Sequence, residues 1–126
     1  MKQNFLLSVY LFAGLLAIIF SSCKHDLDVP ANPQISFGTD VRTIISGNCT
    51  FSGCHGSVDF KRIQLLTYDD VIKNGGIGNS DATKTKLYQS ITGKGADIMP
   101  PSSYSTLTDL QIQTILLWIR QGAKNN

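Results

Sequence analysis

The sequence predicts a small all-α domain of about four helices between residues 36 and 126. Three observations lead to this prediction. Apolar residues recur at spacings of three and four, good helix-capping residues precede each such run, and no run alternates apolar with polar residues over the length of a useful strand. Glycine and asparagine follow the apolar runs, as is usual where helices end.

The first two predicted helices lie on either side of a segment with two cysteines. The first covers 39–48, and its apolar face has members at positions i, i+3 and i+4: Val41, Ile44 and Ile45. The second begins after Thr67, whose hydroxyl can form a capping box with Asp70 three residues later. It is expected to end at 74–76, where asparagine and glycine tolerate a positive φ.

Two further helices are predicted in the C-terminal half. One opens at 80–81 and stops at 92–93. The last begins after Thr108, with Gln111 completing a second capping box and Gly122 at its C-terminal end. Its apolar stripe makes it the strongest helix pattern in the chain: Ile112, Ile115, Leu116 and Ile119.

Length and charge restrict the classes of protein to which the chain can belong. Its 126 residues are enough for one domain, and a net charge of +2 gives no basic surplus of the kind that binds nucleic acid. Many of the apolar residues lie in the first 22 positions, so the rest of the chain has a thin core. Small domains with thin cores are often stabilised by a metal, a disulfide or a cofactor.

The N-terminus is expected to direct export and membrane anchoring. A positive charge precedes an apolar run over 5–20, as in a signal peptide, and the run is short for a membrane span. Small residues then precede Cys23, which resembles the lipidation site of a bacterial lipoprotein. We therefore expect a signal peptide over 1–22 and a lipidated tether over 23–35, with the domain at 36–126 on the periplasmic or cell-surface side of a membrane. The alternatives are an unpaired Cys23 after an ordinary signal peptide, or a retained N-terminal anchor.

The segment Cys49-Thr50-Phe51-Ser52-Gly53-Cys54-His55 combines two thiols with an imidazole. In c-type haem attachment, two cysteines form thioether bonds with the haem vinyl groups, and the histidine after the second cysteine ligates the iron. Here four residues separate the cysteines, instead of the usual two. The Ser52-Gly53 pair offers the backbone freedom that this wider spacing requires.

Two other interpretations of this segment remain open. One is a Cys49–Cys54 disulfide in an exported protein, with His55 as an ordinary loop histidine. The other is a zinc site. Such a site would be one ligand short of the usual four, because the remaining cysteine and histidine lie near the N-terminus.

Met99 is the candidate for the second axial ligand of a haem iron. It is the only methionine besides the initiator, and a thioether paired with histidine favours the reduced iron. The following Pro100-Pro101 restricts the backbone of Met99 and stiffens its loop. Its alternative role is that of a core residue that fills a gap. His25, the other imidazole, lies too close to the expected lipid anchor to be a good candidate.

Together these residues resemble the single-haem class I cytochrome c domains, in particular those of exported bacterial lipoproteins with a widened C-x4-C-H motif. The matching segments cover most of the mature chain: 40–45, Cys49, Cys54 and His55, 66–68, 87–88, 99–101, and 107–123. The resemblance implies a small cytochrome c-like fold whose first and last helices cross and help to enclose one covalently bound haem c. It also implies thioether bonds at Cys49 and Cys54, with His55 and Met99 as the proximal and distal ligands of the iron.

The function expected from this resemblance is that of a membrane-anchored electron carrier. Such a chain would exchange single electrons with redox protein partners and would not be an enzyme by itself. A haem-free binding module stapled by a Cys49–Cys54 disulfide is one alternative. Another is a haem protein whose distal site is open, so that it senses or reacts with a small ligand.

Two further groups of side chains are given packing or surface roles. The aromatic residues expected to lie in the core or against the haem are Tyr88, Tyr104 and Trp118. The lysines expected to form a solvated face are Lys84, Lys86 and Lys94. A basic rim near the haem edge could steer an acidic partner.

Overall fold

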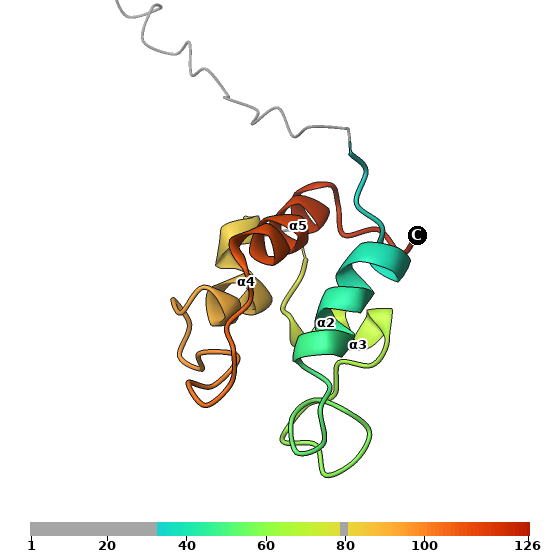
Figure 1. Ribbon diagram of the computed structural model, residues 1–126. Coiled ribbons are helices and arrows are strands. Elements are labelled where there is room, and N and C mark those ends of the chain that lie inside the picture. Colours follow the sequence, from blue (N-terminus) through green and yellow to red (C-terminus); the bar gives the residue numbers. More distant parts are fainter. Residues whose placement is uncertain (1–32, 79–80) are drawn as a thin grey trace, which may run out of the picture.

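The computed structural model describes residues 33–78 and 81–126, and this part of the chain is helical with no strand (Figure 1). Its elements are a π-helical turn η2 (Phe37–Val41), α2 (Arg42–Asn48), α3 (Tyr68–Asn74), a 3₁₀ turn η3 (Ala82–Lys84), α4 (Lys86–Ile91) and α5 (Asp109–Arg120). The predicted all-α class is confirmed, with four α-helices in the described ranges. The predicted signal peptide and Cys23 lie outside those ranges. None of the helices described is long and apolar enough to cross a membrane.

The first helical segment begins earlier than its sequence pattern predicts. The N-cap is Ser36, ahead of the predicted start at 39: its hydroxyl accepts a hydrogen bond from the backbone N–H of Thr39 at 3.3 Å. The backbone N–H of Ser36 in turn donates to the carboxylate of Asp40 at 2.8 Å. This reciprocal cap adds the turn η2 ahead of α2 and brings Phe37 into the core, where it is only 5% exposed.

The second predicted helix is confirmed, and its cap forms as expected. In α3 the Thr67 hydroxyl accepts from the Asp70 backbone N–H at 3.1 Å, while the Asp70 carboxylate accepts from the Thr67 N–H at 2.9 Å. Hydrogen bonds to the carboxylate, first from the Thr67 side chain and then from the backbone N–H groups of Thr67 and Leu66, hold the pKa of Asp70 below its usual value. The positive φ predicted after the helix is taken by Gly76, at 61°.

The third predicted helix is broken in the middle, which corrects the expectation of one helix from 80–81 to 92–93. Thr85 has an extended backbone, with φ −64° and ψ 145°, and separates η3 from α4. Its side chain is 1% exposed; the hydroxyl donates to the carbonyl of Ala82 at 2.8 Å and caps the N–H of Tyr88 at 3.4 Å. The buried hydroxyl thus forms hydrogen bonds with a backbone carbonyl before the break and a backbone N–H after it. Two short elements therefore replace one helix.

The closing helix α5 is confirmed and supplies the centre of the core. Thr108 and Gln111 form the predicted capping box. The indole of Trp118 is completely buried, and its ring lies 5.5 Å from that of Phe37 and 6.4 Å from that of Tyr68. The three rings pack η2, α3 and α5 together.

The two ends of the described chain are joined to each other. Gln121, just after α5, accepts from the backbone N–H of Ile35 at 2.9 Å and donates to the carbonyl of Pro33 at 3.0 Å. The terminal Asn126 accepts from the hydroxyl of Ser36 at 2.7 Å. The last residues of the predicted tether therefore lie against the domain, beside its C-terminus.

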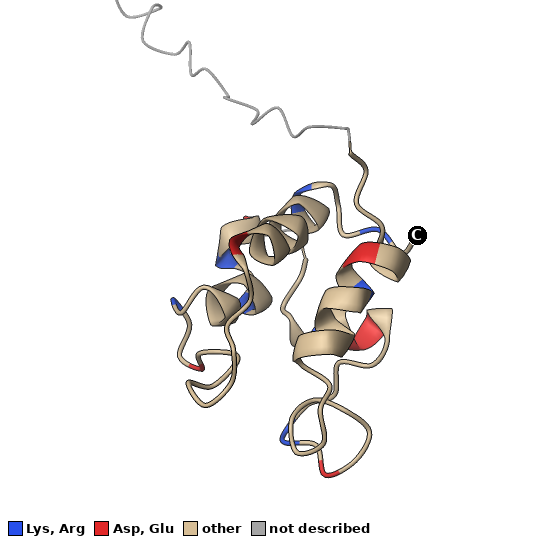
Figure 2. Ribbon diagram, in the orientation of Figure 1, with Lys and Arg blue, Asp and Glu red and all other residues tan. Residues whose placement is uncertain are grey.

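The two long loops of the domain project from the end opposite these termini. Figure 1 shows the loop over 49–67 and the loop over 92–108 side by side at the lower end of the molecule. The first follows α2, and the second connects α4 to α5. Lysine and arginine lie on both loops and on the helices near the second, interspersed with aspartate (Figure 2). Each predicted site residue in the described ranges belongs to one of these loops.

Candidate functional site

The segment with two cysteines closes into a compact loop at the end of α2. Cys49 is the C-cap of α2, and its carbonyl accepts a hydrogen bond from the backbone N–H of His55 at 3.0 Å. Gly53 adopts a φ of 77°, a conformation that suits glycine. Gly56 leaves no space for a Cβ, because the carbonyl of Thr50 lies against it. The loop thus brings both thiols and the imidazole to one side of the domain.

The imidazole of His55 has a fixed orientation. Its Nδ1 lies 3.0 Å from the carbonyl oxygen of Ile63, and the carbonyl of His55 accepts from the backbone N–H of Leu65 at 2.9 Å. A carbonyl oxygen can only accept a hydrogen bond, so Nδ1 must carry the proton in this contact. In the neutral ring Nε2 is then the unprotonated nitrogen, which is the form that binds a metal.

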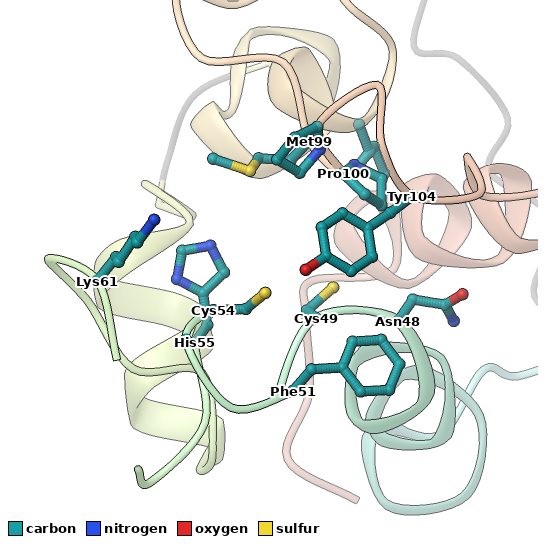
Figure 3. Close-up of a pocket in the computed structure, with 12 residues that line it drawn as sticks. Asn48, Cys49, Phe51, Cys54, His55, Lys61, Met99, Pro100 and Tyr104 are labelled. Carbon is teal, nitrogen blue, oxygen red and sulfur yellow. The ribbon is translucent and has the colours of Figure 1, made fainter. Parts of the chain in front are cut away.

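The two cysteines are free thiols and are both half-buried. Burial, and to a lesser extent the nearby Cys54, raise the pKa of Cys49 to about 11. Cys49 is therefore a protonated thiol at neutral pH. Figure 3 shows both sulfurs at the floor of one pocket, below Met99.

Met99 reaches the same pocket from the opposite loop. Its backbone N–H donates to the carbonyl of Ser90 at 3.0 Å, which holds this part of the 92–108 loop against α4. The next residue, Pro100, is buried, so the backbone around the thioether is held on both sides. Figure 3 shows Met99 and His55 on opposite sides of the pocket.

Two adjoining cavities lie between the loops. The first has a volume of about 150 Å³, and all four predicted residues line it: Cys49, Cys54, His55 and Met99. Its other walls are mostly apolar and come from Asn48, Phe51, Gly53, Lys61, Ile91, Pro100, Pro101 and Tyr104. The second cavity, of about 320 Å³, shares Cys49, His55 and Met99 with the first. A group that fills the first cavity would therefore contact all four predicted residues.

The walls of the cavities differ in one respect from what the resemblance implies. The first helix contributes Asn48, but no residue of α5 lines either cavity. Ile91, at the end of α4, provides the helical wall on that side instead. The buried face of α5 packs against η2, η3 and α4. It therefore contacts α4, which lines the cavities, without lining them itself.

The aromatic residues given packing roles divide between core and pocket. Trp118 lies in the core and lines neither cavity, whereas Tyr104 lines the first cavity and is 50% exposed. Tyr88 is half-buried outside both cavities. Phe51 and Lys61 also line the first cavity and were not predicted from the sequence. Phe51 could have been predicted, because it lies inside the C-x4-C-H motif.

Comparisons with known proteins find no relative of this chain. No protein-family model matches it, and neither the search of curated proteins nor the search of solved structures finds a match. Within residues 33–78 and 81–126, no three side chains among histidine, cysteine, aspartate and glutamate are grouped as a metal site. The functional interpretation therefore depends on the geometry of the two loops.

Proposed function

We propose that the chain is a c-type cytochrome that carries single electrons through one covalently attached haem. The observation behind this proposal is that two free thiols, an oriented imidazole and a thioether line one largely apolar cavity. These are the four groups that attach a haem by two thioether bonds and ligate its iron from both faces. When bound, the haem would supply the reversible change between ferrous and ferric iron.

The four residues have side chains of the kinds that attach and ligate a haem. Cys49 and Cys54 would form the thioether bonds, and neither is used in a disulfide. His55 would ligate through Nε2, since its Nδ1 is engaged by Ile63. Met99 would be the second ligand, and an uncharged sulfur donor favours the reduced iron.

The surroundings of these residues support electron transfer more than catalysis. Ile91 and Pro100 are buried and form apolar parts of the cavity wall. Phe51 and Tyr104 line the same cavity and are 46% and 50% exposed, so the cavity reaches the surface through aromatic side chains. An electron partner could approach a bound haem at this edge without entering the domain.

The proposed membrane anchor is compatible with access to this edge. The described chain begins at Pro33, beside the C-terminus, and the loops that form the cavities lie at the other end of the domain (Figure 1). A lipid on Cys23 would therefore hold the domain by the end remote from its cavities. Membrane fractionation of Cys23→Ser tests the anchor: release of the chain supports it, and unchanged membrane association opposes it.

The experiment that tests the proposed function is a haem stain of the full chain after denaturing electrophoresis. The chain is expressed with a c-type maturation system, because the stain then detects only haem that is covalently bound. Wild type and Ser52→Ala, a loop substitution that keeps both thiols, should stain equally. The double variant Cys49→Ala/Cys54→Ala should not stain. An unstained wild-type band of normal abundance would contradict the proposal.

A further inference from the structure

The second cavity carries charged side chains that the four haem-attachment residues do not explain. Of the residues that line it, three are cationic, Lys61, Arg62 and Lys86, and one is anionic, Asp97. The first cavity has a single charged lining residue, Lys61. Lys61 thus lines both cavities, whereas Arg62, Lys86 and Asp97 line only the second.

One of the three cations is already paired. Arg62 Nη1 lies 3.5 Å from Asp97 Oδ2, so this pair joins the two loops beside the second cavity. Lys61 and Lys86 form no ion pair with any residue in the described part of the chain. Two lysines thus line one cavity without an ion-pair partner among these residues.

The two lysines that line the cavity come from different parts of the chain, the loop over 49–67 and α4. The backbone N–H of Lys61 donates to the carbonyl of Cys54 at 2.8 Å, which places Lys61 next to the attachment loop. Figure 3 shows Lys61 beside the His55 ring. Lys86 is the first residue of α4, and its neighbour Leu87 donates to the carbonyl of Gly75 at 2.9 Å. This bond holds the start of α4 against the end of α3.

We propose that Lys61 and Lys86 bind the two propionate carboxylates of the haem. The inference rests on the proposed function. In a haem the vinyl groups lie on one side of the porphyrin and the two carboxylates on the other. Thioether bonds at Cys49 and Cys54 would keep the vinyl side at the first cavity, so the carboxylates would extend into the second. Two unpaired cations there match two carboxylates in number and in charge.

This arrangement has a measurable electrostatic consequence. A haem carboxylate that lacks a nearby cation stabilises ferric iron, because its negative charge attracts the additional positive charge of that state. Lysines that neutralise the carboxylates therefore raise the reduction potential. Their removal should lower it, while leaving the iron ligands and the covalent bonds in place.

The test is the reduction potential of the haem-loaded full chain, measured by optical redox titration. The variants are Lys61→Gln and Lys86→Gln, with Lys86→Arg as the version that keeps the charge. Lys84→Gln is the matched control, because Lys84 is exposed, lies two residues before Lys86 and lines neither cavity. Titration in about 1 M salt, where the Debye length is about 3 Å, suppresses the influence of distant charges.

The two glutamine variants should have a lower potential than wild type, whereas Lys86→Arg and Lys84→Gln should keep the wild-type value. If the chain carries covalent haem but Lys61→Gln and Lys86→Gln titrate like Lys84→Gln, the carboxylate inference is overturned and the proposed function stands. If wild type carries no covalent haem, both are overturned. Both substitutions are at exposed positions, and the visible spectrum of each variant confirms that the iron ligands are retained.

Discussion

The Nδ1 atom of His55 lies 3.0 Å from the carbonyl oxygen of Ile63, at the far end of the loop that the cysteines begin. This contact sets which ring nitrogen is free, and it holds the ring in place before any metal is present. The loop over 49–67 therefore preorganises the side chain proposed to be the proximal ligand.

The first prediction concerns this imidazole. In haem-loaded His55→Ala the proximal bond is lost, so the visible spectrum should change from low-spin to high-spin, and added imidazole should restore the low-spin form. Ile63→Ala is the control, because it keeps the backbone carbonyl and should keep the wild-type spectrum. A low-spin His55→Ala protein without added imidazole would show that His55 is not a ligand.

The second prediction concerns the thiol of Cys49 in the haem-free chain. Its pKa is raised from 9.0 to about 11, so less thiolate is present at any pH below that value. In Cys54→Ala, burial is the remaining cause of the raised pKa. Each pKa unit lowers the thiolate fraction about tenfold. Cys49 should therefore react with iodoacetamide at pH 8 at least about tenfold more slowly in the folded chain than in urea. Equal rates in both conditions would contradict the burial.

The same pKa shift predicts the pH dependence of apoprotein stability. Because the folded pKa lies above the unfolded value of 9.0, the folded state holds the Cys49 proton more tightly. This contribution to stability is present below pH 9.0 and is lost as the pH rises through about 11. Urea denaturation of the apoprotein should show that decrease, and Cys49→Ala should reduce it.

The third prediction concerns Met99. If it is the second ligand, ferric wild type should show the weak far-red sulfur-to-iron absorption, and the ferrous form should bind carbon monoxide slowly or not at all. Met99→Ala should lose the band, bind carbon monoxide readily and have a lower reduction potential. Ile98→Ala, at a neighbouring residue that is 59% exposed, should behave as wild type. Rapid carbon monoxide binding by wild type would favour a haem protein with an open distal site.

The fourth prediction concerns the core behind the pocket. Trp118 is completely buried between Phe37 and Tyr68, so Trp118→Ala should destabilise the domain by about 3–5 kcal/mol. Leu110, on the same helix, is 73% exposed, and Leu110→Ala should change stability by no more than about 0.5 kcal/mol. Urea denaturation followed by circular dichroism measures both. Similar losses in the two variants would contradict the central position of Trp118.

The helices that could be predicted from the sequence are those fixed by local pairs of residues. Thr67 with Asp70, and Thr108 with Gln111, form capping boxes within single turns, and both were predicted correctly. The early start of the first helix and the break at Thr85 were not predicted. The first depends on Phe37 packing against Trp118, and the second on the burial of a threonine hydroxyl.

The candidate site divides in the same way. Cys49, Cys54, His55 and Met99 could be chosen from their chemistry and spacing, and the fold brings all four to one cavity. The carbonyl of Ile63 could not be identified, because backbone groups have no sequence signal and the loop before it includes residues with positive φ, Asp59 and Arg62. Lys86 was assigned to a solvated face, since only the packing of α4 against the end of α3 shows that it lines the second cavity.

The most direct test of covalent haem attachment is mass spectrometry of the tryptic peptide over 43–61, produced by cleavage after Arg42 and Lys61. This peptide contains both cysteines of the motif and His55. The peptide from the chain expressed with a c-type maturation system, isolated without a reducing agent, should carry one haem through Cys49 and Cys54 and have no thiol that can be alkylated. A haem-free peptide with two free thiols, or with a Cys49–Cys54 disulfide, would contradict covalent haem attachment.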